Sequence, residues 1–168
     1  MDGYVRIVLI ALLTVLYAAF GTPDWMQPGG APYSARALVY PFFHASWWHL
    51  AVNALALWTI YRPGRCKPCR DLLIPYIISC IVYPLSLRPV IGISNVLYAT
   101  LGMRTPPLSS TWWKQSTVII FLVVTVALIF VPQFSATTHI AAFALGMAGA
   151  SVSRWYNKLL KDVRRFVR

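Results

Sequence analysis

The chain has 168 residues, of which 58% are hydrophobic and 11% are charged, and its only acidic residues are four aspartates. A water-soluble domain of this length needs more charged surface, so the composition favours a membrane protein. The formal net charge of +11 could indicate a nucleic-acid-binding protein. However, the basic residues lie between apolar runs and at the C-terminus, where they would set the orientation of membrane spans.

Two apolar runs occupy the first third of the chain. The first, Val5 to Phe20, is short for a span and could also be the core of a signal peptide that ends near Ala18. We favour a retained span, because removal of this run would leave five spans with the two termini on opposite sides. A Pro/Gly-rich loop, Gly21 to Tyr40, precedes the second predicted span, Trp47 to Tyr61, which ends at a group of basic residues.

The helix that follows the third span is too short to cross a bilayer. The third predicted span, Leu72 to Leu87, contains two prolines, which membrane helices tolerate where neighbouring groups satisfy the backbone. After a glycine turn at Gly92, a helix from Ser94 to Met103 would be about 15 Å long, roughly half of the hydrocarbon thickness. If its far end reaches the cytoplasmic surface at Arg104, Ser94 must lie inside the membrane.

Two further predicted spans, Thr117 to Val131 and Thr137 to Ser153, complete the pattern. Basic residues occur in the second-to-third loop, the fourth-to-fifth loop and the C-terminal tail, whereas the fifth-to-sixth loop is uncharged, so both termini are predicted to be cytoplasmic. We therefore predict an all-α, polytopic protein of a prokaryotic inner or cell membrane, with six transmembrane helices in residues 1–153. Residues 154–168 form a basic tail that we expect to bind anionic lipid rather than nucleic acid.

The three cysteines are too few for a disulfide framework. Cys66 and Cys69 have the spacing of half a zinc site, but no second pair follows, and Cys80 stands alone in an apolar run. We interpret all three as ordinary reduced thiols, with an intermolecular metal site or a redox role as the alternatives. No metal or cofactor is predicted.

In the predicted topology, His49, Ser94 and His139 all lie at the outward ends of their helices. Ionisable side chains inside a membrane are costly and therefore suggest function. A serine hydroxyl becomes a strong nucleophile when a base removes its proton, and His139 is the candidate base. No acidic residue lies in a predicted span, and Asp24 is the only acid on the outward side, so the sequence predicts a Ser/His dyad rather than a triad.

A second pair of polar residues could stabilise the product of nucleophilic attack. Attack on an amide creates an oxyanion, which needs hydrogen-bond donors where the charge develops. His49 and Asn53 are four residues apart and so share one face of a helix. We expect them to donate to the oxyanion together with the backbone N–H of Ser94, which is free at a helix start.

Small residues on the sixth span would bring the candidate base close to the candidate nucleophile. Ala142, Gly146 and Ala150 follow His139 at helical spacing, and small residues let helix backbones approach closely in lipid. Tyr98 lies one turn after the serine, where its ring could pack on the ring of His139.

Each of these residues also has a simpler interpretation when taken alone. A helical serine often bonds back to its own helix, and histidine or asparagine in a span often serves only to join helices. A nucleophile, a base, two donors on one face and a stripe of small residues together favour catalysis.

The order and spacing of these residues resemble the rhomboid family of intramembrane serine proteases. Arg36 to His44 resembles the family's first-loop segment, and His49 to Asn53 resembles its H-x-x-x-N motif. Gly92 to Asn95 is similar to the G-x-S-G nucleophile motif, and Tyr98 falls where the family has a tyrosine stacked on the catalytic histidine. His139 to Gly146 resembles the sixth-span motif A-H-x-x-G-x-x-x-G.

This resemblance implies a six-helix fold, a Ser94/His139 dyad and an oxyanion site with His49 and Asn53. It implies that the substrates are transmembrane segments of other proteins in the lipid bilayer, and that the fifth helix, Thr117 to Val131, gates their entry. It implies no metal or cofactor, and it leaves the oligomeric state open.

The chain departs from the family pattern next to the serine. Asn95 stands where the family has glycine, and a side chain at this position would be expected to crowd the substrate carbonyl. Thr138, Ala142 and Ala35 replace an alanine, a glycine and a tryptophan. The alternatives to a protease are a rhomboid-like protein that binds membrane helices without cleaving them, and a small channel or transporter.

Overall fold

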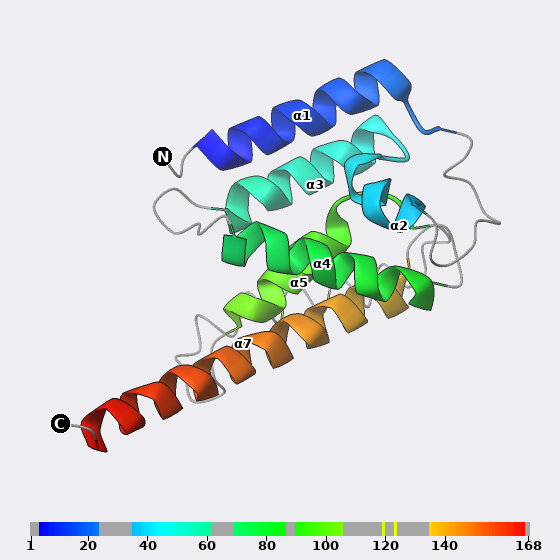
Figure 1. Ribbon diagram of the computed structural model, residues 1–168. Coiled ribbons are helices and arrows are strands. Elements are labelled where there is room, and N and C mark those ends of the chain that lie inside the picture. Colours follow the sequence, from blue (N-terminus) through cyan, green and yellow to red (C-terminus); the bar gives the residue numbers. More distant parts are fainter. Residues whose placement is uncertain are drawn as a thin grey trace.

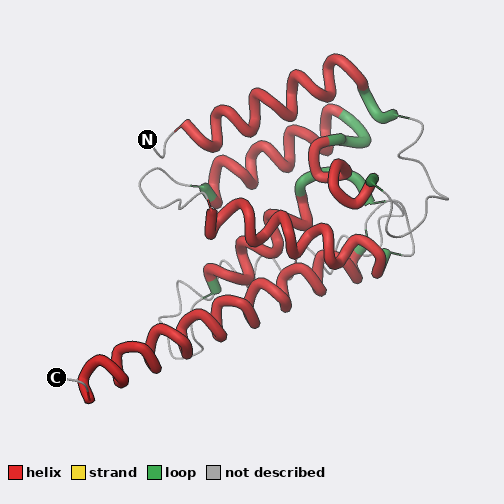
Figure 2. The backbone as a smooth tube through the Cα atoms, viewed as in Figure 1, coloured by secondary structure: helices red, strands yellow, loops and turns green. Residues whose placement is uncertain are grey.

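The computed structural model describes residues 4–23, 35–61, 69–86, 90–105, 119, 123 and 135–166, and within these residues every regular element is helical. The longer elements are α1 (Tyr4–Phe20), α3 (Trp47–Ile60), α4 (Ile74–Val82), α5 (Ser94–Arg104) and α7 (Ala136–Phe166). Figure 1 shows α3 between α1 and the remaining helices, and Figure 2 shows helix along most of the described chain. Among the described helices, none has both the length and the apolar sequence that crossing a membrane requires.

The predicted apolar runs correspond to helices, with differences at their ends. The second run begins at Trp47, where the hydroxyl of Ser46 caps the helix by accepting a hydrogen bond from the backbone N–H of His49 at 3.1 Å. The third run is divided into a π-helical turn (Cys69–Leu73), α4 and a 3-10 helix (Tyr83–Leu85). Pro75 and Pro84 each lie near the start of a new segment, since proline has no backbone N–H to donate within a helix.

Two predictions concern the C-terminal half of the chain. The fifth predicted span, Thr117 to Val131, lies outside the described residues except for Ile119 and Val123, which are both helical. The helix that contains the sixth predicted span does not end at Ser153, because α7 continues to Phe166 and extends beyond the other helices (Figure 1). No proline or glycine follows Gly149 in the sequence, so nothing in the sequence interrupts the helix there.

The short helix α5 is the centre of the fold. Every residue from Asn95 to Met103 is buried, and α5 packs against α3, α4 and α7. Two glycines allow its very close contact with α7. A Cβ atom on Gly102 would overlap the carbonyl oxygen of Phe143, and one on Gly146 would overlap the carbonyl oxygen of Ala99. The backbones of α5 and α7 are therefore in direct contact.

A polar cluster fixes the end of α5 that is distant from Ser94. Arg104 forms an ion pair with Asp71 at 3.1 Å and also donates to the carbonyl of Ile60. Nearby, the hydroxyl of Tyr61 donates to the backbone carbonyl of Asp71 at 2.7 Å and lies 2.7 Å from the hydroxyl of Thr100. These bonds join the end of α3, the turn before α4, and the last turns of α5.

The contact between α5 and α7 gives a test of the fold. Gly146→Ala should lower the free energy of unfolding by about 1–3 kcal/mol, because the added methyl group forces two packed backbones apart. Gly149→Ala is the matched control on the same helix, since a Cβ atom there meets no atom within 4 Å. It should leave stability unchanged or raise it slightly, because alanine favours helix more than glycine does. Thermal unfolding in detergent, followed by circular dichroism, compares the two variants, and equal melting temperatures would contradict this packing.

Candidate active site

The structure brings Ser94 and His139 into hydrogen-bond contact across 45 residues of sequence. Ser94 is the first residue of α5, and His139 lies in the first turn of α7. The Nε2 atom of His139 lies 2.8 Å from the Oγ atom of Ser94. His139 is buried, whereas Ser94 is half-buried.

A backbone carbonyl sets the tautomer of His139. The Nδ1 atom lies 2.5 Å from the carbonyl oxygen of Ser135. Because a carbonyl oxygen can only accept, Nδ1 must carry the proton and Nε2 must be the unprotonated nitrogen. Nε2 therefore accepts the hydrogen bond of the Ser94 hydroxyl, as a general base must. Sequence reasoning missed this contact, because a backbone group leaves no residue-type signal.

The ring of Tyr98 supports the imidazole of His139 from α5. The two ring centroids are 4.7 Å apart, and the rings meet edge-on at 73°. Tyr98 is itself buried among residues of α4, α5 and α7. The ring contact predicted from helical spacing is present, and it limits rotation of the imidazole about its side-chain bonds.

Gly92 lies directly against His49 and Asn53 of α3. A Cβ atom on Gly92 would be 2.7 Å from Cε1 of His49, 3.0 Å from its Nε2 and 3.2 Å from Nδ2 of Asn53. The φ angle of Gly92 is +103°, which side-chain-bearing residues rarely adopt. A glycine is therefore required here for both space and backbone conformation, and its small size places both α3 donors against the turn that leads into Ser94.

The amide of Asn53 is a buried donor with an unused hydrogen-bonding capacity. Asn53 is only 4% exposed, and in the described part of the chain its Nδ2 atom has no hydrogen-bond partner. Ser94 begins a helix, so its backbone N–H also has no intrahelical acceptor. Leaving a buried donor unpaired is costly, so a ligand that carries a negatively charged oxygen would be favoured at this place.

His44 is a neighbour of the site that sequence reasoning did not assign a role. Its side chain is completely buried, and its ring centroid lies 5.2 Å from that of His49. Burial, and secondarily the neighbouring His49, lowers the pKa of His44 to about 3, so this imidazole is neutral at physiological pH. Neither ring nitrogen has a partner among the described residues.

The side chain of Asn95 does not crowd the hydroxyl of Ser94. It is completely buried, and its Nδ2 atom donates to the hydroxyl of Tyr40 at 3.1 Å. Successive helical residues point about 100° apart, so a buried contact for Asn95 leaves Ser94 facing His139. The side chain of Asn95 therefore does not lie where it would obstruct a substrate carbonyl at Ser94.

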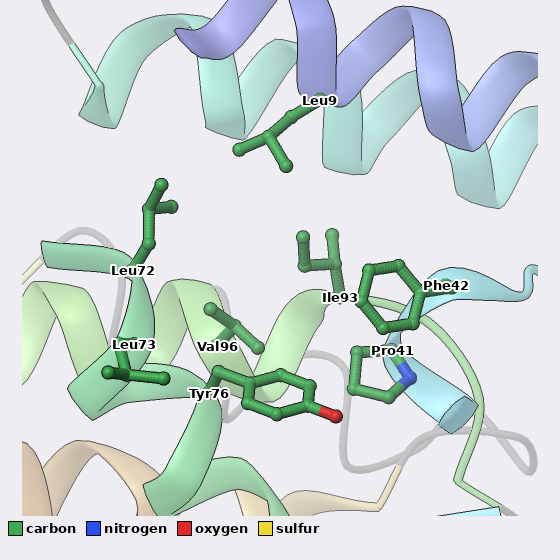
Figure 3. A pocket seen from close by; sticks show the side chains of 8 residues that line it. All are labelled: Leu9, Pro41, Phe42, Leu72, Leu73, Tyr76, Ile93 and Val96. Carbon is green, nitrogen blue, oxygen red and sulfur yellow. The ribbon is translucent and has the colours of Figure 1, made fainter. Parts of the chain in front are cut away.

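A separate apolar cavity of about 340 Å³ is lined in part by Ile93, in the turn that precedes α5, and by Val96 of α5. Figure 3 shows side chains from α1, α4, α5 and the segments between them around this cavity, with Ile93 and Phe42 side by side. No member of the Ser94, His139, His49 and Asn53 group lines it. Its walls are almost entirely apolar, so it offers no groups for the chemistry of an oxyanion.

Two of the residues in the predictions about cysteines and acids lie outside the described ranges. Cys66 and Asp24 both lie outside them, and Cys80 is a free, partly exposed thiol. Within the described ranges, no three His, Cys, Asp or Glu side chains gather as metal ligands would. The described site offers a hydroxyl, an imidazole and hydrogen-bond donors for its chemistry.

Comparison with known proteins identifies the family of the chain. The model of the Rhomboid domain matches residues 33–155, which include every candidate residue described above. No curated protein matches the chain. The match spans 123 of the 168 residues, counting from 33 to 155 inclusive, and so covers well over half of the chain. The chain therefore belongs to the rhomboid family, whose members are membrane proteins and are generally intramembrane serine proteases.

Proposed function

We propose that this protein is a serine endopeptidase that cleaves transmembrane segments of other membrane proteins by a Ser94/His139 dyad. The hydrogen bond of 2.8 Å between Ser94 Oγ and His139 Nε2 is the observation that carries the proposal. A nucleophile bonded to a base, with the base oriented by a third group, is the arrangement that acyl transfer requires. Here the carbonyl of Ser135 is the orienting group.

The reaction proceeds through two tetrahedral intermediates. As Ser94 Oγ attacks the carbonyl carbon of the scissile peptide, its proton passes to Nε2 of His139. The protonated imidazole then gives this proton to the leaving amine, the C–N bond breaks, and an ester between Ser94 and the substrate remains. A water molecule attacks this ester with His139 again as base. The second tetrahedral intermediate then collapses: its bond to Ser94 Oγ breaks, the new carboxyl end is released, and His139 returns the proton to Ser94.

The backbone N–H of Ser94 and the side chains of His49 and Asn53 stabilise the oxyanion in both intermediates. Preorganised donors are most effective where water is excluded, because they need no reorientation as charge develops. The unpaired Nδ2 of Asn53 and the position of His49 against Gly92 support this role. Tyr98 and Gly146 act indirectly, since the first holds the imidazole and the second allows α7 to approach α5.

The membrane arrangement stays a prediction of the sequence. We propose six transmembrane helices in residues 1–153, cytoplasmic termini, and a basic tail in residues 154–168 beside anionic lipid of a prokaryotic inner or cell membrane. The partners are transmembrane protein substrates and the bilayer itself, and no nucleic acid. The fifth span is the proposed entry gate.

Ser94→Ala should abolish covalent labelling by a fluorophosphonate probe, because the nucleophilic oxygen is removed. The purified protein in detergent or liposomes is incubated with the probe and with a model transmembrane substrate, and both labelling and cleavage are measured. Ser151→Ala, on an exposed face of α7, is the control and should behave as the wild type. Cleavage that persists in Ser94→Ala would refute Ser94 as the nucleophile. If the wild type is not labelled and does not cleave the substrate but still binds it, the result would favour a protein that binds membrane helices without cleaving them.

Asn53→Ala should lower kcat by about 10²–10³-fold with little change in KM, because the amide donates most strongly to the charged intermediate. Thr59→Ala on the same helix is the matched control, since the Thr59 hydroxyl bonds within α3, to the carbonyl of Ala56. Steady-state cleavage of a fluorogenic transmembrane substrate separates the two constants. A rise in KM at unchanged kcat would assign Asn53 to ordinary substrate binding instead.

Proteolytic activity should decrease as the pH is lowered through the pKa of His139, because only the neutral imidazole can accept the proton of Ser94. The sign is fixed by the base role, since protonation at Nε2 removes the lone pair that accepts the hydroxyl proton. The rate of probe labelling, measured from about pH 3 to 8, reads the chemical step without substrate release. A rate that does not change over this range would contradict His139 as the base.

A further inference from the structure

Tyr40 holds the chain at two points, one on each side of Ser94. Its backbone carbonyl accepts a hydrogen bond from the N–H of Gly92 at 3.0 Å, and its hydroxyl accepts one from Nδ2 of Asn95 at 3.1 Å. The side chains of Tyr40 and Asn95 are both completely buried. The contacts thus lie two residues before and one residue after the candidate nucleophile.

The direction of each bond in this group is determined by the atoms available. The hydroxyl of Tyr40 donates its single proton to the carbonyl of Ser79 at 3.0 Å, because a carbonyl cannot donate. The hydroxyl must therefore accept from Asn95, which orients the amide with nitrogen toward Tyr40. Neither an ionised aspartate nor an aliphatic side chain could supply this donor.

We infer that the hydrogen bond between Tyr40 and Asn95 positions the nucleophile by fixing the rotation of the first turn of α5. This inference rests on the proposed function, because it assigns the bond a role in the reaction of Ser94. Both residues are positioning residues, since their contacts act on Ser94 through the backbone.

The geometry explains why this bond would matter to Ser94. Neighbouring residues on a helix are about 100° apart, so the side chain of Asn95 points to Tyr40 and α4 while that of Ser94 points to α7. A rotation of the first turn that breaks the contact of Asn95 would also move the hydroxyl of Ser94 away from His139. Ile93, the N-cap residue, has no side-chain cap, so Tyr40 supplies an anchor that the turn otherwise lacks.

The hydrogen bond between Tyr40 and Asn95, here called the tether, keeps the same donor and acceptor over the pH range of enzymatic reactions. Burial, offset in part by the bonds to Ser79 and Asn95, raises the pKa of Tyr40 to about 12. The hydroxyl is therefore neutral and can donate and accept at the same time. Loss of this hydrogen bond in a variant should consequently reduce the rate by a similar factor at each pH.

The experiment compares Tyr40→Phe, Asn95→Ala and the double variant with the wild type, using the full-length protein in detergent. Each single variant should lower the rate constant of fluorophosphonate labelling and kcat about ten-fold, because each removes the hydrogen bond between Tyr40 and Asn95, while KM stays the same. Tyr40→Phe also removes the bond to the Ser79 carbonyl, which lies farther from Ser94 in the sequence. The double variant should be about as slow as either single variant, because both changes remove the same bond.

Two measurements separate positioning from a loss of folded protein. A variant that is partly unfolded labels a smaller fraction of molecules at the wild-type rate, whereas a mispositioned serine labels completely but slowly. Ser79→Ala is the matched control: it removes a buried hydroxyl, which bonds to Tyr76, but keeps the carbonyl that Tyr40 uses. It should label at the wild-type rate. If Asn95→Ala does not fold, Tyr40→Phe, which retains the ring, still gives the test.

Hydrogen exchange tests the tether without any chemistry. Peptides that cover residues 92–98 should exchange faster in Tyr40→Phe and Asn95→Ala than in Ser79→Ala. Single variants that label and exchange like the wild type would overturn the inference, as would a double variant whose loss equals the product of the single losses. If the wild type itself does not react with the probe, the proposed function fails, whereas unchanged exchange refutes the tether separately.

Discussion

The direct backbone contact between α5 and α7 is the constraint on which the site depends. Gly102 and Gly146 each touch a backbone group of the opposite helix, so no side chain separates the two helices along this line. At that separation, the first turn of α7 reaches the first turn of α5, and an imidazole and a hydroxyl can form a bond of 2.8 Å. A wider spacing would leave the half-buried serine and the buried histidine without this hydrogen bond, which is costly for the imidazole in a low-dielectric interior.

The group that orients His139 is a backbone carbonyl, and this has a simple physical consequence. A carboxylate behind the imidazole would add a negative charge to a buried site, and that charge would itself need neighbouring donors. The carbonyl of Ser135 fixes the same tautomer with a dipole and no net charge. The N-terminal turn of α7 supplies this group at a fixed distance, because His139 follows Ser135 by four residues, one helical turn.

Most of the helices and the candidate residues could be predicted from the sequence, because apolar runs and polar exceptions within them are strong local signals. Helix α5 starts at the predicted Ser94 and ends one residue beyond the predicted Met103. What could not be predicted depends on contacts between distant segments. The carbonyl of Ser135 and the backbone contact at Gly102 carry no pattern that a single sequence displays.

Asn95 shows that the direction of a side chain, and not only its identity, decides whether it obstructs a neighbouring nucleophile. A side chain next to a nucleophile would block the substrate only if it pointed along the same direction, and the helical rotation between consecutive residues prevents this. In this chain the extra amide is buried and paired with Tyr40. A glycine there would have greater conformational freedom and no bond to the preceding loop. The polar groups at both ends of α5, Asn95 near its start and Arg104 at its last turn, thus add to the packing of this short helix by restraining its two ends.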